Sequence, residues 1–410
     1  MQFYFLQEIE EELGNILQFW FKNAPDSIHG GFIGKMTYDA QKHTDALKGG
    51  VLNARILWTF AAAYRLSIDH KFSKISSQEL LQTATRAFEY FLAHFRDTTY
   101  GGVYWAVNAD GSASATRKQI YGLAFGLYGV SEYYRATKQE AALEFAIELF
   151  ETIEKHSFDT VNGGYCEAFS RDWQRLEDLR LSQKDRNDPK TMNTHLHIVE
   201  AYVNLYRAWP NIKVKQRIRY LLWIFEQYIL SPDSKHLRLF FDAAWQPQTQ
   251  AISFGHDIEA SWLLYEAAQI VDDKPLVDKW KQIALTLAAA TIEGRNQDGS
   301  LNHEYDPETN HWDAHREWWV TAEGMVGYLN AFMISNDTRF WEYVQKLWDF
   351  AKNHLINTEQ GEWDWGVHPD MSPMKEEDRM GFWKCPYHNA RACMQILMRL
   401  KKIESKLNAE

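Results

Sequence analysis

One unit recurs along the whole 410-residue chain: an amphipathic helix pattern, a turn rich in glycine and aromatic residues, and a second helix pattern. Five of these turns contain glycine, and they begin at His29, Tyr100, Asn162, Asp298 and Gln360. A sixth copy without glycine occupies residues 236–241. The copies are separated by roughly 60 to 75 residues, about the length that two helices and their connections require. Six helical hairpins of one length predict an all-α fold that closes into a ring.

The repeat gives twelve helix patterns. They fall near residues 3–20, 50–66, 76–95, 117–136, 139–156, 191–208, 213–230, 252–271, 275–290, 316–333, 338–355 and 385–402. Every second pattern carries less charge and more small residues, such as the alanines at 61–63. We expect these six to form an inner ring and the other six a solvated outer ring. No linker rich in Pro, Ser or Gly interrupts the repeat, so we expect one domain over residues 1–410.

The composition narrows the classes of partner. Aromatic residues make up 15% of the chain, with 17 Trp, which favours a large core or an aromatic-lined pocket of the kind that binds sugars. A net charge of −11 disfavours nucleic acid and anionic membrane as partners. No apolar stretch approaches the length that spans a membrane. Three Cys cannot form a disulfide framework, and the first 20 residues read as a helix and not as a signal peptide. We therefore expect a cytoplasmic protein, and a monomer.

Polar residues of chemical interest stand near the start of each inner pattern. They are, in chain order, Arg55, Tyr121, Asn193 with His197, His256 with Glu259, Trp319 with Glu323, and His388 with Arg391. Because their spacing follows the repeat, we expect all six clusters at the same end of the ring. The helix N-termini there would add about 0.3–1 kcal/mol each for a nearby anion. Glu259 follows His256 by three residues, so we expect its carboxylate to hold the imidazole tautomer.

These residue types favour proton transfer next to a carbonyl group. A single buried His is more often structural than catalytic, and the role of His195 stays open; three His in register with Arg55 are more informative. Imidazole contributes about 10²–10⁴-fold as a general acid or base. We expect His256 and His388 to face each other across a substrate and Arg55 to stabilise an enediolate oxygen. The sequence contains no H-E-x-x-H, Cys/His metal spacing or phosphate-loop motif, so we expect neither metal nor cofactor.

Four segments carry a resemblance to a known family. They are Gly50–Phe60, Met192–His197, Ser253–Trp262 and Phe382–Asn389. Together they closely resemble the cellobiose 2-epimerases of the N-acylglucosamine 2-epimerase superfamily, and the similarity extends over nearly the whole chain. The resemblance implies an (α/α)6 barrel that epimerises the reducing-end glucose of β-1,4-linked disaccharides at C2. Cellobiose would give glucosyl-mannose, and lactose would give epilactose.

The resemblance also implies roles for individual residues. His256 and His388 would be the acid/base pair, and Arg55 and His197 would serve the ring-opened sugar and its enediolate. The residues expected to contact the substrate are Tyr121, Asn193, Glu259, Trp319 and Glu323, with Trp383 and Asp185 at the distal sugar. Glu323 is also compatible with a structural role. Cys385 stands where the resemblance leads us to expect Gly; if that position needs a positive φ, the turn that carries His388 is altered.

Three other functions fit parts of the pattern. An aldose–ketose isomerase acting on mannose-type monosaccharides shares the enediolate, although Trp383 and the irregular segment 168–190 favour a disaccharide. An inverting glycoside hydrolase needs two carboxylates about 6.5–9.5 Å apart, for which Glu259 and Glu323 are candidates. Three His are superfluous to that reaction. A non-catalytic glycan-binding toroid has no need of both His256 and His388.

Overall fold

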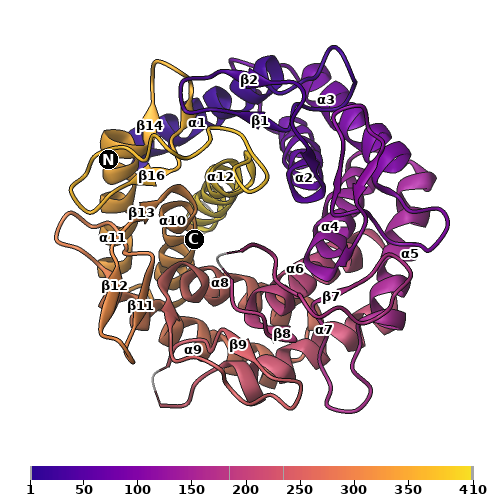
Figure 1. Cartoon of the computed structure of the whole chain (residues 1–410). Helices are drawn as coiled ribbons and strands as arrows, with labels where there is room; N and C mark the ends of the chain where they lie inside the picture. The colour runs from indigo at the N-terminus through magenta and orange to yellow at the C-terminus, as the bar shows by residue number, and fades with distance from the viewer. Residues whose placement is uncertain (1, 184, 234, 408–410) are drawn as a thin grey trace.

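The computed structural model describes residues 2–183, 185–233 and 235–407, and within these residues twelve α-helices form a closed double ring (Figure 1). The outer helices are α1 (Gln2–Asn23), α3 (Ser77–Tyr90), α5 (Glu140–His156), α7 (Ile212–Ile224), α9 (Lys274–Ala290) and α11 (Thr338–Phe350). The inner helices are α2 (Gly50–Ser67), α4 (Ile120–Thr137), α6 (Met192–Ala208), α8 (Phe254–Val271), α10 (Trp318–Ser335) and α12 (Tyr387–Leu407). The predicted all-α (α/α)6 barrel is confirmed.

The inner helices pack side by side in chain order, and α12 packs against α2 to close the ring. Their low charge follows from this position, because an inner helix is buried on nearly all sides. In α4, for example, every residue from Ile120 to Tyr133 is buried. The small residues allow close packing: a Cβ on Gly129 would lie 2.6 Å from the Ala54 carbonyl oxygen of α2. A larger residue at this position would push the two helices apart.

Four outer helices end in a turn of different pitch. Three continue into π-helical turns, η1 (Phe91–Phe95), η2 (Phe225–Ile229) and η4 (Ala351–Leu355), and α9 continues into the 3₁₀ turn η3 (Thr291–Gly294). The helix patterns expected at 76–95, 213–230 and 338–355 therefore each contain an α-helix and a wider last turn.

Short antiparallel strands lie in the loops that lead to the inner helices. The pairs are β1 (Lys35–Met36) with β2 (Lys42–His43), β6 (Lys118–Gln119) with β7 (Ala168–Phe169), β8 (Lys190–Thr191) with β9 (Phe240–Phe241), β13 (Arg316–Glu317) with β16 (Gly366–Val367), and β14 (Ile356–Asn357) with β15 (Glu362–Trp363). Three-stranded sheets are formed by β3 (Lys48–Gly49), β4 (Ala106–Val107) and β5 (Ala113–Ala115), and by β10 (Ile252–Ser253), β11 (Glu304–Asp306) and β12 (His311–Asp313). Strands of two or three residues leave no periodicity in a sequence.

These strands tie neighbouring repeats together at one end of the barrel. The strand before an inner helix pairs with a strand from the following hairpin, as β3 does with β4. A bridge between Met36 and Met380 joins the first hairpin to the sixth. All six inner helices begin at this end, so their N-termini converge beneath the loops.

An ion pair with a buried lysine joins several of the glycine turns to the residues just before the next inner helix. It joins Asp26 to Lys48, Asp97 to Lys118, Asp159 to Lys190 and Glu362 to Lys384, at 2.8, 2.8, 2.8 and 3.2 Å. In the hairpin without glycines, His236 pairs with Asp257 of α8 at 2.6 Å instead. Among the helices described, none is both long and apolar enough to cross a membrane.

Candidate active site

The polar side chains near the starts of the inner helices form one connected cluster at the N-terminal end of the inner ring. Arg55 of α2 donates through Nη2 to the Tyr121 hydroxyl of α4 at 2.8 Å. The Tyr121 ring meets the His197 ring of α6 edge-on, with centroids 5.1 Å apart. Arg55 is buried, and its guanidinium lies 4.1 Å from the centre of the Phe125 ring. A permanent cation is thereby held among aromatic rings, where water does not screen it.

His388, on the first turn of α12, is oriented by a carboxylate. Its Nδ1 lies 2.7 Å from Glu323 Oε1 of α10. An ionised carboxylate only accepts hydrogen bonds, so the neutral imidazole donates through Nδ1–H and leaves Nε2 free to take a proton. Burial, followed by the cations Arg55 and Arg391, lowers the pKa of His388 well below its usual value. His388 is therefore neutral at pH 7, as a general base must be.

His256 is oriented by a hydroxyl, and the expectation that Glu259 would hold it is wrong. Its Nδ1 lies 2.8 Å from Ser253 Oγ, three residues earlier, whereas Glu259 bonds elsewhere. Burial and the neighbouring histidines lower the pKa of His256 to about 3. The Trp319 ring lies close to both histidines, with its centroid 4.9 Å from that of His256 and 5.8 Å from that of His388. One tryptophan thus contacts both imidazoles.

Arg391 joins three carboxylates at the centre of the barrel. Its Nη2 donates to Glu259 at 2.6 Å and to Glu323 at 2.5 Å, and its Nη1 donates to Glu200. Glu200 in turn accepts from His197 Nδ1 at 2.9 Å. Glu259 was predicted from its spacing to bond His256. It accepts from Arg391 instead, because its side chain lies one helical turn further along α8 than that of His256.

The carboxylates around Arg391 differ in charge. Burial opposes ionisation of Glu200, but Arg391 and His197 outweigh it and lower the pKa to about 2. Burial and the nearby Glu323 raise the pKa of Glu259 to about 7. The cluster therefore contains one firmly ionised carboxylate and one that can hold a proton near neutral pH.

One group of side chains has the composition of a metal site. The ligand atoms of Glu259, Glu323 and His388 lie within 4.8 Å of one another. However, Arg391 Nη2 donates to both carboxylates, so a guanidinium already supplies the positive charge there. A divalent cation would have to displace Arg391, which is 1% exposed, from this position.

Asn193 and Asp185 lie beside His256. All three line a small hollow of about 90 Å³ that residues 179–181, 186 and 188 help to form. Asn193 Oδ1 is buried and has no hydrogen-bond partner among the described residues. Asp185 accepts from the Ser182 backbone N–H at 2.8 Å. Asp185, expected at a distal sugar, is thus placed close to one of the two candidate acid/base groups.

Trp383 lies on the other side of the cluster, half-buried against Trp105 and Tyr121, with ring centroids 5.9 and 6.0 Å away. The neighbouring Cys385 does not have a positive φ, so the concern about its turn does not apply. Its Sγ instead accepts a weak hydrogen bond from Arg55 Nη1 at 3.9 Å.

Sequence reasoning passed over several residues of the cluster. Ser253 and Tyr387 were not singled out, and Arg391 was noticed only as a neighbour of His388. Tyr387 donates to Glu200 and lies against Arg391. The available signal for Arg391 was its position between Ala390 and Ala392 on an inner helix, because a charged residue among small ones at such a place needs buried partners. The open case of His195 is structural: both its ring nitrogens bond the backbone, at Thr191 O and Tyr165 N.

Known proteins match this chain over nearly its whole length. The sequence profile of the N-acylglucosamine 2-epimerase (GlcNAc 2-epimerase) family matches residues 31–392. A cellobiose 2-epimerase from Bacteroides fragilis is 44% identical over 392 residues, covering 95% of this chain and 98% of the relative. One from Ruminococcus albus is 38% identical, covering 96% and 98%.

Solved structures agree with the sequence comparison. The structure of cellobiose 2-epimerase from Bacillus thermoamylovorans B4167 superposes with a TM-score of 0.91 at 38% identity, covering 97% of this chain and 100% of that one. The chain therefore belongs to the N-acylglucosamine 2-epimerase family and is a sugar 2-epimerase.

Proposed function

We propose that this enzyme inverts C2 of the reducing-end glucose in β-1,4-linked disaccharides, converting cellobiose to glucosyl-mannose and lactose to epilactose. The observation that carries the proposal is the pair of histidines, His256 and His388, which both lie close to Trp319 and have different partners at Nδ1. Inversion at carbon requires a proton to leave one face and another to arrive at the opposite face. Two separately oriented imidazoles supply both groups. The relatives named cellobiose 2-epimerase support the choice of substrate.

The reaction begins with the ring-opened aldose. One histidine removes the C2 proton through its free ring nitrogen, and the electron pair moves into a C1–C2 double bond, which leaves an enediolate. Arg55 and His197 stabilise the enediolate oxygen; a fixed donor of this kind is worth about 10²–10³-fold in rate. The second histidine, which is protonated at the start of the step, delivers that proton to the opposite face of C2, and the sugar ring closes as the epimer.

The numbers of cationic and anionic groups in the cluster leave room for one added proton. Arg55 and Arg391 are cationic, and Glu200, Glu259 and Glu323 are anionic when ionised. With neutral histidines and three ionised carboxylates the cluster has one excess negative charge, which one added proton, on Glu259 or on a histidine, balances. A two-base epimerase needs one protonated and one neutral partner at the same time, so this balance favours the working state.

The remaining polar groups bind the sugar in this proposal. Tyr121 and Asn193 contact the reacting residue from the two sides of the cluster. Glu259 and Glu323 act behind it through Arg391 and His388, and Trp319 forms the surface close to both histidines. Trp383 stacks on the distal sugar, which accounts for a disaccharide as substrate, and Asp185, which was expected at the same sugar, contacts the substrate beside His256.

Incubation of the purified enzyme with cellobiose in D2O tests the proposal. We expect glucosyl-mannose by chromatography, with one deuterium at C2 of the mannose residue by NMR, because the arriving proton comes from a solvent-exchanged imidazole. A ketose as the main product would indicate an isomerase, free glucose a hydrolase, and no product a binding protein. Epimer without deuterium at C2 would contradict proton transfer between two groups.

A further inference from the structure

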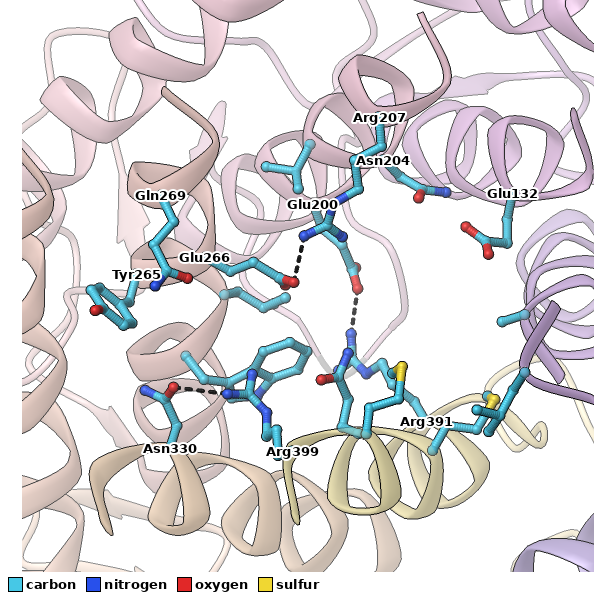
Figure 2. A pocket seen from close by; sticks show the side chains of 18 of the residues that line it. Glu132, Glu200, Asn204, Arg207, Tyr265, Glu266, Gln269, Asn330, Arg391 and Arg399 are labelled. Carbon is cyan, nitrogen blue, oxygen red and sulfur yellow. Dashed lines mark hydrogen bonds and ion pairs between the residues drawn. The ribbon is translucent and has the colours of Figure 1, made fainter. Parts of the chain in front are cut away.

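A large cavity opens at the end of the barrel where the inner helices end. Its volume is about 780 Å³, and side chains from all six inner helices line it (Figure 2). Several of its charged groups pair with one another, as Arg207 does with Glu266 at 2.6 Å and Arg391 with Glu200. A carboxylate that the proposed reaction does not use lies at the other end of the barrel. It belongs to Glu317.

Glu317, the residue before α10, holds two indole rings with its carboxylate. Its Oε2 accepts from Trp319 Nε1 at 2.6 Å, and its Oε1 accepts from Trp365 Nε1 at 3.2 Å. The side chain is only 14% exposed, so water competes little for these bonds. A bond from an N–H to a carboxylate is charge-assisted and about twice as strong as one between neutral groups. The orientation of Trp319 is therefore tied to Glu317.

A histidine balances the charge of this carboxylate. His303 Nε2 lies 3.9 Å from Glu317 Oε2, the same oxygen that Trp319 bonds, and His303 Nδ1 lies 3.0 Å from Asp313 Oδ2. Burial opposes protonation of His303, but Glu317 and Asp313 outweigh it and raise the pKa of His303 to about 10. His303 is therefore an imidazolium at pH 7, and it attracts the Glu317 carboxylate at short range.

The opposite edge of the Trp319 ring is held by packing. A Cβ on Gly255 would lie 2.6 Å from Trp319 Cζ3, closer than two such atoms approach. Gly255 precedes His256, so the indole lies directly against the backbone that carries one of the two imidazoles. With Nε1 bonded at one edge and the ring packed at the other, the indole has little freedom to turn.

The position of this ring matters because it contacts both candidate acid/base groups. Its centroid lies 4.9 Å from that of His256 and 5.8 Å from that of His388. Trp319 is half-buried, so part of its surface stays accessible. A displacement of about 1 Å between reacting groups can lower a rate by about 10²-fold.

We propose that Glu317 is a positioning residue for epimerisation. It fixes the Trp319 indole, and through this ring the sugar, at the place where the two histidines reach C2. The His303 imidazolium holds Glu317 in turn. This role rests on the proposed acid/base action of His256 and His388.

Steady-state kinetics on cellobiose tests the role with two variants of Glu317. Glu317→Ala removes the acceptor and should lower kcat about tenfold to 100-fold, with less than about a threefold change in KM, because alignment is lost while the binding surface remains. Glu317→Gln keeps one acceptor oxygen and should keep kcat within about fivefold of wild type. The matched control is Glu8→Ala, which removes a carboxylate that accepts from Trp348 Nε1 at 2.7 Å in the outer ring and should leave kcat unchanged.

A double-mutant cycle separates the positioning of Trp319 from support of the loop that carries Trp365. Trp319→Phe removes the same N–H from the other partner, so adding Glu317→Ala to it should lower kcat further by less than about twofold. Adding Glu317→Ala to Trp365→Phe should still lower kcat by the full factor. The reverse pattern would place the action of Glu317 at Trp365 and overturn the proposal.

The indole N–H signals give a readout that does not depend on turnover. In protein with isotope-labelled tryptophan, the Trp319 Nε1–H resonance is identified by its absence from Trp319→Phe. It should move upfield in Glu317→Ala, because the bond to a carboxylate is lost. An unchanged resonance, or wild-type kcat in Glu317→Ala, would contradict the positioning role alone. A wild-type enzyme that forms no epimer would contradict the proposed function and this role with it.

Discussion

At the scale of the residue, three histidines of one cluster differ in the group that faces Nδ1. Glu323 faces His388, Glu200 faces His197 and the uncharged Ser253 faces His256. Burial lowers the pKa of both His388 and His256, although one ring faces a carboxylate and the other a hydroxyl. These partners therefore set the orientation and tautomer of each ring and do not by themselves decide its charge.

Replacing either proposed acid/base group should mainly slow the chemical step. We expect His256→Ala and His388→Ala each to lower kcat on cellobiose by about 10²–10⁴-fold, with a much smaller change in KM. Steady-state kinetics measures both. His311→Ala, at an exposed position, serves as the control. A variant at either site that keeps more than about a tenth of wild-type kcat would remove that residue from proton transfer.

The low pKa of His256 also predicts how stability depends on pH. The folded protein binds a proton at this ring only near pH 3, compared with a usual value of 6.5. Between these values the unfolded chain binds more protons at this ring than the folded protein does. The stability that the neutral ring contributes to folding is therefore complete above pH 6.5 and is lost as the pH falls. We expect the Tm of His256→Gln to fall less than that of the wild type when the pH is lowered from 6.5 to 4. Parallel Tm curves from circular dichroism would contradict the assignment.

At the scale of the element, the segment that leads into α12 carries Trp383 to the side of the cluster formed by Tyr121. Stacking of a second sugar on this ring is worth about 1–3 kcal/mol. Trp383→Ala should therefore lower kcat/KM for cellobiose and lactose by about one to two powers of ten, with a much smaller change for free glucose or mannose. Equal losses on both classes would place Trp383 in the reacting subsite or the core.

The ion pairs that join the glycine turns to the residues before the inner helices should stabilise these turns most where both partners are buried. Lys48 and Asp26 are both fully buried, so Lys48→Met leaves an unpaired carboxylate and should cost about 3–5 kcal/mol in the free energy of unfolding. Urea denaturation measures the change. The control is Lys35→Met, which removes an exposed partner of Asp378 and should cost less than about 1 kcal/mol. Similar costs for the two variants would mean that the buried pair does not fasten the turn.

At the scale of the whole molecule, one layer of side chains around Arg391 divides the barrel into two compartments. Arg391 occupies the place between Glu259 and Glu323 that a cation would need. We therefore expect dialysis against EDTA to leave epimerase activity unchanged in a standard assay. Loss of activity that one specific divalent ion restores would contradict this role of Arg391.

The sequence by itself determined the ring, the alternation of outer and inner helices and most of the residues that gather in the cluster. This was possible because the hydrophobic period and the hairpin repeat are local properties, and because a repeat places equivalent positions at the same end. Arg55, Tyr121, His197, His256, Trp319 and His388 were all found in this way. The two-residue strands were not, since they form only when distant loops meet.

Only the tertiary structure decided which side chain bonds which. Spacing on α8 favoured a bond between His256 and Glu259, but a spacing of three residues states only that contact is feasible. Arg391 offers Glu259 a permanent charge in a buried setting, and this outweighs a neutral imidazole. The large cavity at the other end of the barrel could not be read from the sequence either, because its wall is assembled from six inner helices that are far apart in the chain.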